Sequence, residues 1–118
     1  MSEDPGETQE LGDYAVLERL YAVIASRREA DPEYSYVARL LRKGTPKLAQ
    51  KVGEEAIEAA IAATLRDPRE LVKESADLLF HLLVLWFDAG IKPGEVWAEL
   101  ARREGMSGID EMKSRPKG

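Results

Sequence analysis

Two short clusters of acidic residues carry the clearest chemical signal in this sequence. The first contains Glu54, Glu55 and Glu58, and the second, after a gap of 15 residues, contains Glu74 and Asp77. Both lie in segments that otherwise consist largely of Ala, Leu, Ile and Val. Ionised carboxylates are rarely placed among apolar side chains without compensation, because removing a charge from water is costly. A divalent cation is the simplest compensation, so the two clusters predict a metal site.

Helical geometry supports this prediction. At 100° per residue, the three glutamates of the first cluster fall within a sector of roughly 100°. In the second segment, Glu70, Glu74, Asp77 and His81 form a strip about 60° wide on a helix that is otherwise mostly apolar. The two helices are joined by a turn of a few residues, so antiparallel packing would bring both strips together.

The donor atoms indicate which cation fits. Carboxylate oxygens favour Mg²⁺ or Mn²⁺ over zinc or copper. A ferritin-like di-iron site is disfavoured, because it needs two Glu-x-x-His pairs and this chain has a single histidine, His81. A lone histidine on an apolar helix is more often a hydrogen-bonded packing residue than a catalyst, and the sequence leaves its role open.

The simpler alternative is that both acidic strips are solvated helix faces. Lys47, Lys51 and Lys73 would then form ordinary surface ion pairs, which contribute about 0.3–0.5 kcal/mol each. Lysine precedes glutamate along the first helix, which is the weaker order for such pairs. Several carboxylates meeting at one place would also repel each other unless a cation separates them.

A row of basic residues precedes the acidic clusters. Arg39, Lys43, Lys47 and Lys51 are spaced four residues apart, and Gly44 and Thr45 interrupt the row at a predicted helix start. Helix N-termini bind phosphate through free N–H groups and the positive end of the helix dipole. Beside a metal site, this row indicates phosphoryl transfer or hydrolysis of a polyphosphate.

The elements that must position these residues are all helices. Pro, Gly and N-cap signals, together with helical apolar spacing, predict four to five helices and no strand. Ser35 is the expected N-cap of the second helix, Thr45 that of the third and Asp67 that of the fourth. The expected helices cover residues 14–28, 36–43, 46–66, 68–90 and 93–103, and the buried side of the last should include Val96, Trp97 and Leu100.

Composition limits the remaining possibilities. The chain has 118 residues, 44% of them hydrophobic and 33% charged, with a net charge of −5 and no cysteine. We expect one soluble domain at residues 14–104, a flexible arm at 1–13 and a tail at 105–118. An acidic chain argues against nucleic acid as a partner. The apolar run at residues 78–87 is too short to span a membrane and is expected in the core or a dimer interface. Without a signal or transit sequence, a cytoplasmic location is expected.

The same segments carry a family resemblance. The stretches SYVARLLRKGTPKLAQKVGEEAIEAAIAAT and ELVKESADLLFHLLVLW closely resemble the phosphoribosyl-ATP pyrophosphatases of histidine biosynthesis. The acidic pattern EExxE…ExxD is similar to that of the wider MazG-like superfamily of all-α NTP pyrophosphatases. The resemblance covers about residues 17–103, and the acidic positions show no departure from the pattern.

The resemblance implies Mg²⁺-dependent hydrolysis of phosphoribosyl-ATP to phosphoribosyl-AMP and pyrophosphate by a homodimeric all-α bundle. It also suggests a phosphoribosyl-AMP cyclohydrolase as a partner. Glu54 and Glu55 are the catalytic candidates, and the sequence does not decide which carboxylate removes the proton. The expected metal ligands are Glu55, Glu58, Glu74 and Asp77, and the expected phosphate-binding residues are Lys43, Thr45, Lys47 and Lys51.

Two other functions stay open at this point. A housekeeping pyrophosphatase acting on non-standard (d)NTPs would have the same fold and metal chemistry but another pocket. A non-catalytic helical dimerisation module would have solvated acidic faces, with no Mg²⁺ binding. The matched acidic strip on an otherwise apolar helix argues against the second of these.

Overall fold

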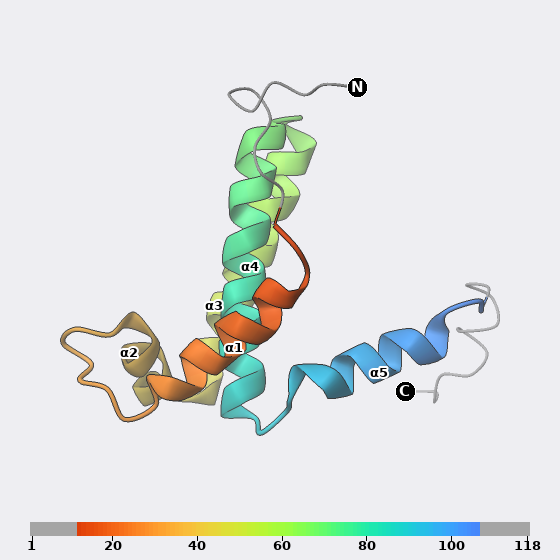
Figure 1. Ribbon diagram of the computed structural model, residues 1–118. Coiled ribbons are helices and arrows are strands. Elements are labelled where there is room, and N and C mark those ends of the chain that lie inside the picture. Colours follow the sequence, from red (N-terminus) through yellow and green to blue (C-terminus); the bar gives the residue numbers. More distant parts are fainter. Residues whose placement is uncertain (1–11, 107–118) are drawn as a thin grey trace, which may run out of the picture.

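The computed structural model describes residues 12–106 of the chain, and these residues form helices joined by short turns (Figure 1). No strand occurs in this part of the chain, so the all-α prediction is confirmed. None of its helices is both long and apolar enough to cross a membrane. The helices are α1 (Ala15–Ser26), α2 (Tyr36–Lys43), α3 (Thr45–Thr64), α4 (Pro68–Asp88) and α5 (Pro93–Arg103).

The two longest helices, α3 and α4, form an antiparallel helical hairpin against which α1 and α2 pack (Figure 1). The turn between them contains Arg66 with φ 57°. Asp67 then caps α4, because its side chain accepts a hydrogen bond from the backbone N–H of Glu70. The hairpin places the two acidic clusters on neighbouring helices, as the short connection predicts.

The core lies at the end of the hairpin where α1 and α2 cross it (Figure 1). Each of its buried aliphatic side chains contributes roughly 1.5–3 kcal/mol by leaving water. Leu83 and Val84 of α4 are fully buried there, so this part of the 78–87 run is core. The cluster consists of Ile24, Val37, Leu40, Leu48, Leu83 and Val84.

The junction between α2 and α3 differs from the prediction in one respect. Ser35 caps α2 as expected, since its hydroxyl accepts a hydrogen bond from the N–H of Ala38. Gly44 ends α2 with φ 90°, and it is also the N-cap of α3. The expected N-cap, Thr45, is instead the first residue of α3, and its hydroxyl donates to the Asp88 carboxylate at 2.6 Å. This bond ties the start of α3 to the end of α4.

Helix α5 extends away from the hairpin (Figure 1). Its base is held by Trp97, whose indole N–H donates to Glu18 at 2.7 Å and whose ring meets Trp86 edge-on. Leu100, expected on the buried side of this helix, is 54% exposed. The contacts of α5 with α1 and α4 described above are made by Trp97, and Leu100 lies nearly one turn beyond it.

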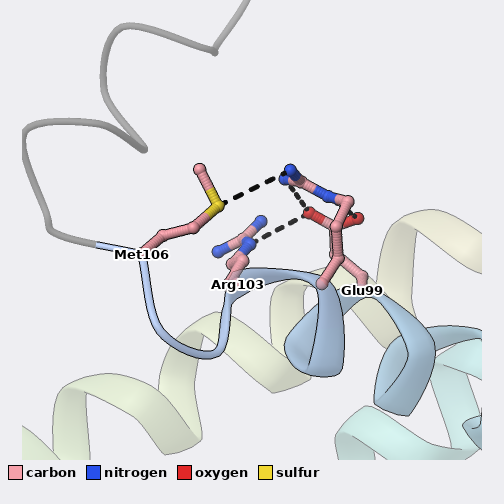
Figure 2. Close-up of polar contacts among 4 residues, drawn as sticks. Glu99, Arg103 and Met106 are labelled. Atoms are coloured by element: carbon pink, nitrogen blue, oxygen red, sulfur yellow. Dashed lines mark hydrogen bonds and ion pairs between the residues drawn. The ribbon is translucent and has the colours of Figure 1, made fainter.

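The last turn of α5 is organised around Glu99 (Figure 2). Its carboxylate accepts hydrogen bonds from Arg102 and Arg103 at 2.7 and 3.0 Å. These bonds, from Arg102 first and Arg103 second, lower the pKa of Glu99 to about 2. Arg102 also lies 4.0 Å from the sulfur of Met106, so the chain after the helix folds back onto it.

The end of the hairpin that carries the α3–α4 turn projects beyond α1 (Figure 1). Several large apolar side chains of the hairpin are exposed to solvent. The sequence pattern predicts that α4 is buried on nearly every side, but Val72 is 71% exposed. The reason is that α1 and α2 cover only the opposite half of the hairpin. We refer to the exposed residues as the outer apolar surface: Ile57, Ile61, Leu65, Val72 and Leu79.

Candidate active site

Three of the predicted metal ligands meet between α3 and α4. Carboxylate oxygens of Glu55, Glu58 and Glu74 all lie within 4.8 Å of one another. Glu55 and Glu58 are one turn apart on α3, and the antiparallel α4 brings Glu74 against them. Oxygen atoms from three carboxylates at this separation can surround a single hard cation.

Glu55 is the member of this group that most needs a positive partner. Its side chain is buried, with 6% of the residue exposed, and its Oε2 atom has no hydrogen-bond partner among the described residues. The other oxygen, Oε1, lies 3.3 Å from Nζ of Lys51. A buried carboxylate oxygen without a partner is costly, and a hard cation at the cluster would satisfy it. The residues present therefore fit Mg²⁺ or Mn²⁺.

Contacts with Glu55 shift the pKa values of two neighbouring side chains, Glu58 and Lys51. When Glu58 carries a proton it can donate a hydrogen bond to Glu55, and this bond, together with the negative charges of Glu55 and Glu74, raises the pKa of Glu58. A hydrogen bond with Glu55 likewise raises the pKa of Lys51. The higher pKa of Glu58 is the behaviour expected of carboxyl groups that share a site without a cation between them, since a proton both forms the hydrogen bond and removes the repulsion.

The other two acidic candidates lie beside the cluster. Asp77 is half-buried on α4, one turn after Glu74, but its carboxylate is not among the three that come within 4.8 Å of one another. Glu54 is exposed on α3, and its Oε2 atom accepts a hydrogen bond from Gln50 at 3.0 Å. The two residues stay candidates, as the ligand and the general base respectively.

His81 is a buried hydrogen-bonding residue that joins α4 to α2. Its Nδ1 atom lies 2.7 Å from the backbone carbonyl oxygen of Asp77, which can only accept, so Nδ1 carries the proton. In the neutral ring, Nε2 then accepts the hydroxyl proton of Tyr36, at 2.9 Å. Tyr36 also stacks on Phe80, with 6.1 Å between ring centroids.

Sequence reasoning missed this role of Tyr36. It placed the residue on the second helix but gave it no part in the site, because its partner lies 45 residues away. The only local signal is a large aromatic residue next to the Ser35 cap. A pairing between two helices that are distant in sequence has no spacing by which it could be recognised.

A cleft of about 630 Å³ runs between α2 and α3, next to the carboxylates. Three of the four predicted phosphate-binding residues, Lys43, Lys47 and Lys51, line it. The fourth, Thr45, is not part of the cleft lining, because its hydroxyl is directed to Asp88. Besides the three lysines, the cleft is lined by Tyr36, Leu40, Gln50 and Glu54.

The region of this chain that matches known proteins includes the helices that form this site. A family model described as phosphoribosyl-ATP pyrophosphohydrolase matches residues 17–104. The chain belongs to the phosphoribosyl-ATP pyrophosphohydrolase family. The match spans most of α1 and all of α2 to α5, so the carboxylates and the cleft lie inside the region that defines the family.

Individual members of the family are closely similar to this chain. A phosphoribosyl-ATP pyrophosphatase of Paramagnetospirillum magneticum is 60% identical over 105 residues, which cover 89% of this chain and 96% of that protein. The protein of the same name from Azospirillum brasilense is 57% identical over 101 residues, covering 86% and 91%. That of Rhodospirillum rubrum is 55% identical over 102 residues, covering 86% and 87%. The resemblance drawn from the sequence motifs is confirmed.

Proposed function

We propose that this chain hydrolyses phosphoribosyl-ATP to phosphoribosyl-AMP and pyrophosphate, the second step of histidine biosynthesis. The observation that carries the proposal is membership of the phosphoribosyl-ATP pyrophosphohydrolase family over residues 17–104. The carboxylate cluster and the lysine-lined cleft support it, because a polyphosphate needs both a cation site and positive charge.

The proposal assigns a divalent cation, Mg²⁺ or Mn²⁺, to the carboxylate cluster. Glu55, Glu58 and Glu74 would hold it, and Asp77 is a further ligand candidate. When bound, such an ion neutralises phosphate charge and makes the phosphorus more electrophilic. The buried oxygen of Glu55 that lacks a partner is the structural reason for expecting an ion there.

The side chains around the cluster divide the remaining tasks. Lys51 lies between the buried Glu55 and the cleft, where its charge can stabilise the reacting phosphates. Of the two catalytic candidates, Glu54 lines the open cleft and Glu55 is buried in the cluster. This favours Glu54 as the base that takes the proton of the attacking water and Glu55 as a metal ligand.

The proposal includes a homodimer. The outer apolar surface contains five large apolar side chains that are exposed, and exposed apolar surface of this kind can mark a site of association. Ile61 and Leu65 of this surface line a hollow together with Glu58, Glu70 and Glu74. A second copy bound here would therefore border the carboxylate cluster. A phosphoribosyl-AMP cyclohydrolase as the next partner and a cytoplasmic location stay predictions.

The test is release of pyrophosphate from phosphoribosyl-ATP and from a panel of dNTPs, with and without Mg²⁺. We expect Mg²⁺-dependent release from phosphoribosyl-ATP and little from the dNTPs. Release from dNTPs alone would keep the metal chemistry and assign the chain to the housekeeping pyrophosphatases. No release from any of these compounds would contradict the proposed function.

A further inference from the structure

The three cleft lysines differ in what they contact. Lys51 is paired with Glu55 beside the carboxylate cluster. Lys43 and Lys47 lie at the other end of the cleft, next to the turn at Gly44. Within residues 12–106, neither of these two lysines forms an ion pair with a carboxylate. The far end of the cleft therefore carries two positive charges that are not neutralised by this part of the chain.

The start of α3 adds to the positive potential at this end. This helix has 20 residues, and no side chain caps its first turn, because its N-cap residue is Gly44, which has no side chain. Its first N–H groups and the positive end of its dipole are therefore left beside Lys43 and Lys47. The Asp88 carboxylate, which accepts from the Thr45 hydroxyl, lines a different hollow, with Tyr21 and Lys92.

This end is too far from the carboxylates to serve the reacting phosphates. Lys47 precedes Glu55 by eight residues, which is about 12 Å along a helix. Helical side chains also lean toward the N-terminus of their helix, so Lys47 leans away from the cluster. A pyrophosphate group held at the cluster reaches Lys51, whereas Lys47 lies one further turn of helix away.

We propose that Lys43 and Lys47 form a second phosphate subsite, which binds the phosphate of the substrate's phosphoribosyl group. This inference rests on the proposed function, since phosphoribosyl-ATP carries that phosphate in addition to its triphosphate, with the nucleoside between them. The cleft joins the two ends, so one molecule can place its triphosphate at Lys51 and its other phosphate at Lys43 and Lys47. A simple nucleoside triphosphate has no group for the second subsite.

The two reaction products separate the subsites experimentally. Phosphoribosyl-AMP retains the phosphoribosyl phosphate, whereas pyrophosphate comes only from the reacting end. We expect Lys43→Gln and Lys47→Gln, singly and together, to raise the inhibition constant of phosphoribosyl-AMP, about tenfold for each lysine. The inhibition constant of pyrophosphate should not change. Lys51→Gln should instead weaken inhibition by pyrophosphate.

Arg42→Gln is the matched control. Arg42 is an exposed cation next to Lys43 on α2, but it does not line the cleft. The substitution should leave both inhibition constants unchanged, and circular dichroism should show that all variants are folded. The second subsite would be overturned if Lys43→Gln and Lys47→Gln weakened inhibition by both products equally, or if they left inhibition by phosphoribosyl-AMP unchanged. A wild-type chain that does not hydrolyse phosphoribosyl-ATP would instead contradict the proposed function.

Discussion

At the scale of single residues, Glu58 links the charge of the cluster to the stability of the fold. Its pKa is raised by a hydrogen bond with Glu55 and by the charges of Glu55 and Glu74. A carboxyl group with a raised pKa in the folded state stabilises the protein below its unfolded pKa. That stabilisation is lost as the pH rises through the folded pKa. At neutral pH and without a cation, the ionised Glu58 side chain therefore lowers the stability of the folded state.

This predicts that Glu58→Gln raises the melting temperature of the metal-free protein at pH 7 by a few degrees. The gain over wild type should shrink as the pH is lowered through the raised pKa of Glu58, because the wild-type side chain then becomes neutral too. Differential scanning calorimetry in EDTA across a pH series measures both effects.

Mg²⁺ provides the matching control. At about 100 times its Kd, a bound ion adds about 2.7 kcal/mol to the free energy of unfolding. Wild type should show this stabilisation, and Glu58→Gln should show less of it at the same Mg²⁺ concentration. A variant that is no more stable than wild type without metal, yet equally stabilised by Mg²⁺, would contradict the position assigned to Glu58.

Residue types and spacing identified the carboxylates but not all of their surroundings. Glu55, Glu58 and Glu74 could be placed together from the sequence, because helical periodicity and a short connection fix their faces. The burial of Glu55 and its pairing with Lys51 depend on how α4 packs, which periodicity does not determine.

At the scale of helices, α2 is attached to α4 by one specific polar contact. Tyr36 donates to the buried His81, and Phe80 packs on the Tyr36 ring. Since Tyr36 and Lys43 are both on α2 and line the cleft, this contact fixes one wall of the cleft relative to the carboxylates.

Tyr36→Phe removes only the hydroxyl and leaves Nε2 of His81 buried without its partner. The expected cost is about 1–3 kcal/mol of unfolding free energy, which urea denaturation measures. Tyr34→Phe is the control, because Tyr34 is 84% exposed and should be replaceable without loss. Equal stability of both variants would show that the hydrogen bond to His81 does not hold α2 in place.

The helices themselves were largely predictable, because proline, glycine and capping residues mark their ends. Ser35 and Asp67 cap α2 and α4 as predicted, and α5 covers the predicted residues. The prediction that Thr45 is the N-cap of α3 was wrong, because two features cannot be recognised from the neighbouring sequence. Gly44 already provides the turn with its positive φ, and Asp88, from the far end of α4, takes the Thr45 hydroxyl.

At the scale of the whole molecule, the outer apolar surface is the feature that supports the proposed homodimer. Its members are exposed apolar residues from both arms of the hairpin. The proposed dimer would bury them. The sequence pattern showed α4 to be apolar on most sides, but it could not divide that surface between the core and a partner.

We expect wild type to have the mass of a dimer in light scattering at micromolar concentration, and Val72→Glu to have that of a monomer. The reason is that a charge placed in an apolar interface must be desolvated without a partner. Val16→Glu is the control, because Val16 is a similarly apolar exposed residue on α1 and lies outside this surface. A monomeric wild type would contradict the dimer.

The most direct test of the account is Mg²⁺-dependent pyrophosphate release from phosphoribosyl-ATP by wild type and by Glu55→Gln. We expect a loss of at least roughly 100-fold in the variant, because the buried carboxylate at the centre of the proposed metal site is gone. Glu33→Gln, at an exposed glutamate before α2, should retain full activity. A folded Glu55→Gln protein with wild-type activity and Mg²⁺ dependence would show that the carboxylate cluster is not the catalytic metal site.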